Sequence, residues 1–149
     1  MNISFDLDGT LIPNGNEFDT EKRSVIAKCI GIEKIRKGTP DLISDLQSKN
    51  HNIHIYTTSF RTKTNIWLTL KYYGIKANRI VNQTENQKLL KSLHTNSSKY
   101  PKAFDFDIHI DDSDGVKIEG EKFNFKTIII KPTDQYWIHK IKTEIESFR

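Results

Sequence analysis

The sequence Asp-Leu-Asp-Gly-Thr at residues 6–10 directly follows a short alternating run, Ile-Ser-Phe, at residues 3–5. Alternate residues of an extended strand point to the same side, so Asp6 and Asp8 would present two carboxylates together where the strand ends. Gly9 then allows the backbone to turn sharply and to approach a ligand. Two like charges repel, so the pair favours a shared proton or a bound cation, and Mg2+ suits oxygen ligands of this kind.

Polar residues also end two other apolar runs. Thr57 and Thr58 follow Ile53–Tyr56, and the pair Asp111-Asp112 closes the run that begins at Phe106. In a parallel sheet the carboxyl ends of the strands lie at one edge, where ligands bind. We therefore expect these clusters to meet Asp6 at a single edge of the sheet.

The elements that would position these residues alternate between strand and helix. This alternation predicts an α/β protein of three layers, α/β/α, in which helices cover both faces of a mostly parallel five-stranded sheet. The expected strands are Ile3–Leu7, Ile53–Thr57, Arg79–Asn82, Phe106–Asp111 and Thr127–Ile130. The expected helices run from Thr39 to about Asn50, from Thr62 to Gly74, over Glu85–Leu93 and over Gln135–Phe148.

Local signals fix some details of these helices. Thr39 is expected to cap the first helix, with Pro40 at its first position. Trp67, Tyr73 and Trp137 fall at core positions of helical periodicity, so core packing is preferred to base stacking for them. His54 and His109 lie in core strands without a His or Cys partner at ligand spacing, so we interpret them as structural histidines.

The composition indicates a single soluble domain spanning residues 1–149. Charged residues make up 28% and hydrophobic residues 36% of the 149 residues, and the longest apolar runs are too short to span a bilayer. We expect no signal peptide, and the single cysteine, Cys29, suits a cytoplasmic location. The net charge of +4 favours a solvated lysine-rich surface, although anionic substrates or nucleic acid stay open.

The three polar clusters together could carry out phosphoryl transfer. A Mg2+ ion between Asp6 and Asp111 would balance charge and offer a position to a phosphate oxygen. Asp6 could attack phosphorus to give an aspartyl-phosphate, while Asp8 protonates the leaving oxygen and later activates water. The Thr57 hydroxyl, with nearby backbone N–H groups, could hold a phosphoryl oxygen, and a lysine would neutralise the remaining charge.

These residues resemble the motifs of the haloacid dehalogenase (HAD) superfamily. The first motif, Asp-x-Asp-Gly-Thr after an apolar strand, is matched by residues 6–10. The second, a Thr or Ser that ends an apolar strand, is matched by Thr57, and the fourth, an acidic pair, by Asp111-Asp112. The third is a single lysine before the last of these strands. The motifs occur in the order of the family and cover most of the chain.

The resemblance implies a Rossmann-like (HAD-like) fold and a role for each matched residue. Asp6 would be the nucleophile and Asp8 the general acid and base. Mg2+ would be held by the Asp6 carboxylate, the Asp8 backbone carbonyl and Asp111, with Asp112 in support. Gly9, Thr57, Thr58 and the lysine would bind the substrate phosphate. An Asp at position 8 implies a phosphatase, because the dehalogenases of the superfamily lack it.

Three lysines precede the fourth expected strand, namely Lys88, Lys99 and Lys102. We favour Lys99, because residues 97–98 (Ser-Ser) could cap a short helix over Lys99–Phe104 that presents Lys99 at its start. Lys88 also lies near a helix start and could reach the same edge.

Many relatives in this superfamily carry a cap domain, for which this sequence leaves no room. About forty residues separate Leu11 from the second strand, and Asn14-Gly15 is typical of a tight hairpin turn that suits a small flap. The single domain should therefore have an open site. Such a site suits a large phosphorylated substrate, such as a nucleic-acid end or a phosphoprotein, unless a second subunit of a homo-oligomer closes it.

Other interpretations of the same residues stay open. A phospho-accepting receiver module also combines an acidic cluster, Thr and Lys, but needs its acidic pair after the first strand, whereas here the pair at 111–112 follows the fourth. A catalytically silent binding protein is a further alternative. Arg61, just beyond Thr57, could bind a substrate anion or serve as an ion-pair partner.

Overall fold

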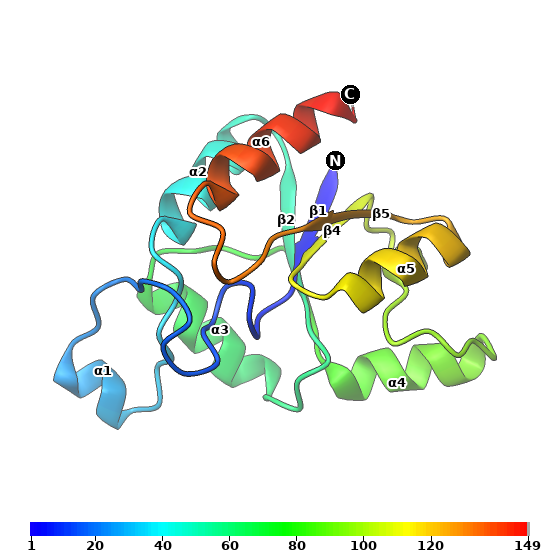
Figure 1. The fold of residues 1–149 in the computed structure, drawn as a ribbon. Coiled ribbons are helices and arrows are strands. Elements are labelled where there is room, and N and C mark those ends of the chain that lie inside the picture. The colour runs from blue at the N-terminus through cyan, green and yellow to red at the C-terminus, as the bar shows by residue number, and fades with distance from the viewer. Residues whose placement is uncertain (149) are drawn as a thin grey trace.

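The computed structural model describes residues 1–148 and has a five-stranded sheet at its centre (Figure 1). The strands are β1 (Asn2–Phe5), β2 (Asn52–Tyr56), β3 (Arg79–Val81), β4 (Ile108–Asp111) and β5 (Lys126–Ile129). Their order is β3-β2-β1-β4-β5, and all four neighbouring pairs are parallel. The predicted α/β fold with a parallel five-stranded sheet is confirmed, and β1 occupies the middle of the sheet.

Helices connect the strands and cover the sheet. They are α1 (Val25–Cys29), α2 (Thr39–Ser48), α3 (Lys63–Tyr72), α4 (Gln83–Ser92), the 3-10 helix η1 (Pro101–Phe104), α5 (Asp114–Phe123) and α6 (Trp137–Ser147). The four longer helices expected from the sequence are present as α2, α3, α4 and α6. No helix in residues 1–148 is long and apolar enough to cross a membrane.

The sequence did not predict α5, which contains two glycines. Glycine lowers helix propensity and weakens the periodic pattern. Gly120 is nevertheless required, because a Cβ there would lie 2.9 Å from the carbonyl oxygen of Phe125 and 3.0 Å from a methyl of Thr127. This close packing of α5 on β5 explains why a glycine stands inside the helix.

One face of the sheet is aliphatic. Ile3 and Phe5 of β1 lie beside isoleucines of the neighbouring strands, and all of these side chains are fully buried. Side chains from α2, α3 and α6 complete this cluster, among them Leu42, Ile43, Leu46, Ile66, Leu70, Trp137, Ile141 and Ile145. This face forms the main hydrophobic core.

The opposite face is polar and aromatic. It carries Ser4, His54, Tyr56 and His109, which alternate with the aliphatic residues along β1, β2 and β4. The Tyr56 hydroxyl accepts a hydrogen bond from the Tyr100 N–H at 2.8 Å. It donates one to Oδ1 of Asn86, a residue of α4, at 2.5 Å. The rings of Tyr56, Phe104 and Phe106 form a second, smaller core cluster on this side. Ser4, Tyr56 and His109 on this face thus have specific hydrogen-bond partners, whereas the ring nitrogens of His54 have none among the described residues.

Two details of the predicted helices are wrong. Thr39 lies inside α2 and its hydroxyl donates to the Arg36 carbonyl at 2.7 Å, so the N-cap is Gly38, which has a left-handed φ of 86°. Trp67 is 48% exposed rather than buried, because Ile66 and Leu70 form the buried stripe of α3. A position adjacent to a helix stripe is rotated by about 100° from it, which turns Trp67 toward solvent.

Two predictions about short segments are also wrong. The hairpin expected at Asn14-Gly15 is not formed: residues 14–18 are bends, and no two paired strands flank them within residues 1–148. The Asn14 N–H donates instead to the Glu17 carboxylate at 2.9 Å. The helix expected over Lys99–Phe104 begins only at Pro101, as η1. Lys99 therefore comes from the irregular segment before η1, where its carbonyl accepts a hydrogen bond from the Ser97 hydroxyl.

Candidate active site

The carboxyl edge of the sheet gathers three aspartates. Asp6 follows β1, its N–H donating to the Ile110 carbonyl of β4 at 2.9 Å, and Asp111 is the last residue of β4. Oxygens of Asp6, Asp111 and Asp112 all lie within 4.8 Å of one another. Because β1 is flanked by β2 and β4, Thr57 and Asp111 follow or end the strands on either side of Asp6. The structure thus brings Asp6, Asp111 and Asp112 together, and the strand order puts Thr57 at the same edge of the sheet.

Lys99 is the lysine that reaches this cluster. Its Nζ lies 2.9 Å from Asp6 Oδ1 and 2.6 Å from Asp111 Oδ2, and the residue is 3% exposed. Burial opposes the charge of the ammonium, but the two carboxylates outweigh it and raise the pKa of Lys99. Lys88 and Lys102, the other lysines considered, are exposed on the surface.

The Asp111 carboxylate is held by three groups of the chain. Its Oδ2 accepts from Lys99 and lies 3.0 Å from His109 Nε2, while its Oδ1 accepts from the Ser113 N–H at 2.9 Å. Burial opposes ionisation, yet the His109 and Lys99 contacts outweigh it and hold the pKa of Asp111 well below its usual range. Asp111 is therefore a fixed carboxylate.

His109, interpreted from the sequence as a structural histidine, is buried beside Asp111, a contact that the sequence interpretation did not include. Its Nδ1 lies 2.9 Å from the Ser4 hydroxyl, and burial lowers the pKa of the imidazole. If the ring is neutral and donates from Nε2 to the ionised Asp111, its Nδ1 is an acceptor for the Ser4 hydroxyl, which also lies 3.2 Å from the Ile108 carbonyl oxygen. A signal was available, because residues two apart on a strand share a face, as His109 and Asp111 do.

Asp6 is buried with an incomplete set of partners. Its Oδ1 forms the ion pair with Lys99 but has no hydrogen-bond partner among the described residues. Burial raises the pKa of Asp6, which Lys99 partly counteracts. When ionised, the three carboxylates outnumber the nearby ammonium groups, which are those of Lys99 and of Lys131, and the ligands are hard oxygens. The donor set therefore fits a divalent cation such as Mg2+.

Gly9 makes room for Asp112. Its φ is 74°, and a Cβ at this position would lie 2.4 Å from Asp112 Oδ2, so no larger residue fits without displacing that carboxylate. The Gly9 N–H donates to the Ile12 carbonyl at 2.9 Å. Burial, together with the neighbouring Asp111, raises the pKa of Asp112. Phosphate binding by Gly9 stays a prediction, whereas its steric role is seen directly.

The Asp8 carboxylate is bound by Arg61 rather than by the acidic cluster. Arg61 Nη1 donates to Asp8 Oδ2 at 2.8 Å, and the guanidinium also contacts Glu33. Of the two interpretations of Arg61, the ion-pair partner is the one that the structure supports. The proposed metal contact of Asp8 involves its backbone carbonyl and stays a prediction.

Thr57 and Thr58 differ in exposure at the end of β2. Thr57 is 1% exposed, and its hydroxyl accepts from the Ser59 N–H at 3.1 Å, which retains the hydroxyl proton for donation. Thr58 is exposed. Their roles in binding phosphate stay predictions.

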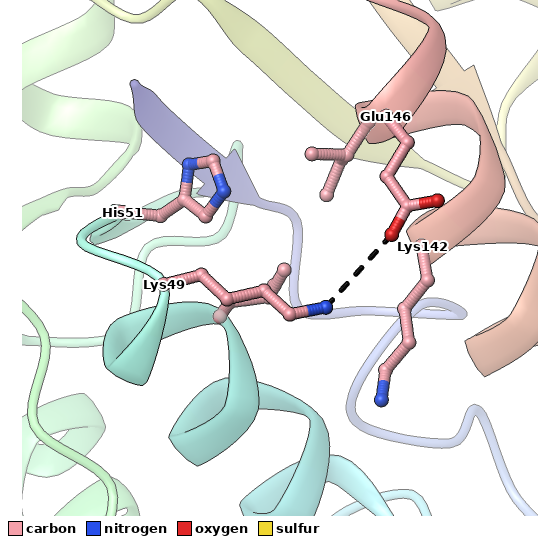
Figure 2. A pocket seen from close by; sticks show the side chains of 6 residues that line it. Lys49, His51, Lys142 and Glu146 are labelled. Atoms are coloured by element: carbon pink, nitrogen blue, oxygen red, sulfur yellow. Dashed lines mark ion pairs between the residues drawn. The ribbon is translucent and has the colours of Figure 1, made fainter. Parts of the chain in front are cut away.

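A separate cavity of about 220 Å3 lies at the amino edge of the sheet, between the end of α2 and α6 (Figure 2). Its cations are compensated, since Lys49 pairs with Asp45 at 3.4 Å and Glu146 at 3.9 Å, and Lys142 pairs with Asp45 at 2.9 Å. It lies at the end of the strands opposite Asp6 and adds no group to the site.

Comparison with known proteins supports the fold. No family model matches the sequence, and no curated protein matches it. Eight chains among the solved structures match. One of them, described as a predicted HAD-like family hydrolase from Porphyromonas gingivalis, has a TM-score of 0.52 and 14% sequence identity, over 99% of this chain and 97% of that chain. At this identity the likeness concerns the fold.

Proposed function

We propose that this chain is a Mg2+-dependent phosphomonoester hydrolase that acts through an aspartyl-phosphate on Asp6. The observation that carries the proposal is Lys99 Nζ, placed 2.9 Å from Asp6 and 2.6 Å from Asp111 beside a third carboxylate. Buried carboxylates with a charge deficit are a costly arrangement that a purely structural site would not need. The fold shared with a described HAD-like hydrolase adds support.

Asp6, Asp111 and Asp112, together with the Asp8 carbonyl, would hold the ion. Bound Mg2+ would supply charge neutralisation and polarisation of a phosphoryl oxygen. The Asp111 partners His109 and Ser113 keep its carboxylate oriented before the ion binds.

Asp6 attacks phosphorus with a carboxylate oxygen, and the bond from phosphorus to the substrate oxygen breaks. Lys99 neutralises charge on Asp6 and on the transferring group, and Thr57 donates its hydroxyl to a phosphoryl oxygen. Asp8 enters this step protonated, with Oδ2 held by Arg61, and gives the proton to the leaving oxygen, which departs as an alcohol.

The second half of the reaction regenerates the enzyme. Asp8, now a carboxylate, takes a proton from a water molecule that attacks the phosphorus of the aspartyl-phosphate. The acyl-phosphate bond breaks, releasing inorganic phosphate and the Asp6 carboxylate. Each proton given by Asp8 in the first half is thus recovered in the second.

We assign the whole chain to one catalytic domain without a separate cap. Without a cap, the site would admit a phosphate carried on a large molecule. The substrate would then be a phosphoprotein or a small phosphomonoester, or alternatively the end of a nucleic acid.

A phosphatase panel tests the proposal. Wild-type protein, Asp6→Asn and the surface control Lys102→Met are assayed against aryl, sugar, nucleotide and oligonucleotide phosphates, with Mg2+ and with a chelator. We expect turnover by wild type and Lys102→Met that needs Mg2+ and disappears in Asp6→Asn. Equal inertness of wild type and Asp6→Asn would contradict the proposal, and stable phosphorylation of Asp6 without turnover would favour a phospho-accepting module.

A further inference from the structure

We propose that Arg61 is a positioning residue for Asp8 and that Glu33 fixes Arg61 in that task. This inference rests on the proposed function, in which Asp8 must meet a leaving oxygen and then a water from one place. The three residues come from separate parts of the chain and are linked by two ion pairs that share Arg61.

The Arg61 guanidinium is held at every nitrogen. Nε donates to Glu33 Oε1 at 2.6 Å and Nη2 donates to Glu33 Oε2 at 2.8 Å, which is the two-point geometry of an arginine–carboxylate pair. Nη1 donates to Asp8 Oδ2 and to the Ser59 hydroxyl, each at 2.8 Å. Because the planar guanidinium is fixed by Glu33, the two N–H groups of Nη1 have defined directions, one toward Asp8 and one toward Ser59.

Glu33 is itself anchored to α3. Its N–H donates to the Thr69 hydroxyl at 3.3 Å, and its carbonyl accepts from the Tyr73 hydroxyl at 3.0 Å. The backbone on both sides of the Glu33 side chain is therefore attached to α3 or to Tyr73, the residue at its C-cap. The carboxylate that clamps Arg61 thus has a rigid support.

The loop that carries Arg61 is fixed as well. The Arg61 N–H donates to the Ser59 hydroxyl at 3.1 Å, and the Asn82 side chain donates to the Arg61 carbonyl at 3.0 Å. Hydrogen bonds that hold the backbone reduce the freedom that the long arginine side chain would otherwise have. Position and direction of the guanidinium are both determined.

The local charge argues against Arg61 as a binder of substrate phosphate. One guanidinium lies between two carboxylates, so it offers no unbalanced positive charge to a second anion. The Glu33 contacts, followed by that of Asp8, outweigh burial and raise the pKa of Arg61, so the group stays charged. A residue saturated in this way orients its partner and does not compete for the substrate.

Leaving-group dependence tests this inference. Proton donation matters greatly for alkyl phosphates, whose alkoxide leaves poorly, and little for 4-nitrophenyl phosphate. We expect Arg61→Met to lower kcat for an alkyl phosphate at least about tenfold more than for 4-nitrophenyl phosphate, with Glu33→Gln smaller in the same direction. Arg61→Lys should restore part of the loss. Arg79→Met is the matched control, since Arg79 forms its ion pair with Glu85, at 2.7 Å, and not with Asp8.

Crystal structures of wild type and Arg61→Met give a readout that needs no activity. We expect the Asp8 carboxylate to change rotamer or lose order in Arg61→Met while Asp6 stays in place. Equal losses for both substrates, or an unmoved Asp8, would overturn the inference. If wild type hydrolyses neither substrate, the proposed function fails, and the position of Asp8 in the two structures still decides the role of Arg61.

Discussion

The two faces of the sheet differ in how they obtain stability. On the aliphatic face, Ile3 and Phe5 belong to a large cluster of similar side chains that all contribute by removing apolar area from water. On the polar face, Ser4, His109, Asp111 and Lys99 form a chain in which each group satisfies the next. The arrangement of the aliphatic face does not depend on any single side chain, because its members resemble one another. The hydrogen-bond network of the polar face depends on every member.

The difference follows from strand alternation. Asp6 continues the side of Ser4, and Asp111 continues the side of His109, so the active-site carboxylates extend the polar face beyond the strand ends. Buried polar groups without partners cost free energy, so this face keeps its geometry only while the network is complete. The contrast predicts that substitutions in the polar network impair function, together with stability where a buried charge loses its partner, whereas those on the aliphatic face lower stability and leave function in the folded protein intact.

Lys99→Met should give the largest effect. It removes the cation between Asp6 and Asp111 and leaves buried carboxylates without compensation, at a cost of about 3–5 kcal/mol in the free energy of unfolding. Phosphatase activity should be lost entirely. Urea unfolding and the aryl phosphate assay measure the two effects, and Lys102→Met should change neither. Retained activity in Lys99→Met would remove Lys99 from the site.

Ile110→Ala should show the opposite balance. Ile110 is fully buried on the aliphatic face, so truncation should lower the free energy of unfolding by about 2–5 kcal/mol. At a temperature where the variant is folded, kcat should stay within a few-fold of wild type. A large loss of kcat in folded Ile110→Ala would show that the two faces are not separable.

His109→Leu should mainly weaken the metal site. Asp111 loses the hydrogen bond at 3.0 Å that helps to orient it, and outer partners of this kind change metal affinity by about 10–100-fold. We expect the Mg2+ concentration for half-maximal activity to rise by about tenfold. Calorimetric titration with Mg2+ provides a second measurement. His54→Phe, on the same face without a carboxylate contact, should leave the Mg2+ requirement unchanged.

The smallest effect concerns pH and His54. Burial, and then Arg79, lower the pKa of His54, and neither ring nitrogen has a hydrogen-bond partner among the described residues. The unfolded chain therefore takes up a proton near pH 6.5 that the folded chain does not, so stability falls as pH drops from 7 to 5. The slope from one such proton is at most about 1.4 kcal/mol per pH unit. His54→Phe should flatten the curve, and identical curves would contradict the assignment.

Much of the site was visible in the sequence because it depends on strand ends. Asp6, Thr57 and Asp111 follow or end short apolar runs, and the parallel order of such runs determines which edge they share. Lys99 was expected for a partly wrong reason, since the helix thought to present it begins two residues later.

Other features depend on tertiary contacts that no local pattern encodes. Glu33 contacts Arg61 because the segment of residues 13–38 packs against α3. Contacts such as the hydrogen bond between Glu33 and Thr69 hold the segment there. Trp67 has helical periodicity close to the buried stripe, and only the packing of α3 decides on which side of the stripe it falls. Sequence patterns therefore predicted the carboxylate cluster better than the groups that orient it.

The central place of β1 has a consequence for synthesis of the chain. Ser4 and His109 are 105 residues apart, so a nascent chain growing from its N-terminus can pair β1 with β2 long before β4 emerges. During that interval one edge of the middle strand is open to other chains. The charge of Asp6 at its end discourages edge-to-edge association, as charged residues do on natural edge strands. Asp6, the residue proposed as nucleophile, would then also reduce aggregation of the chain during translation.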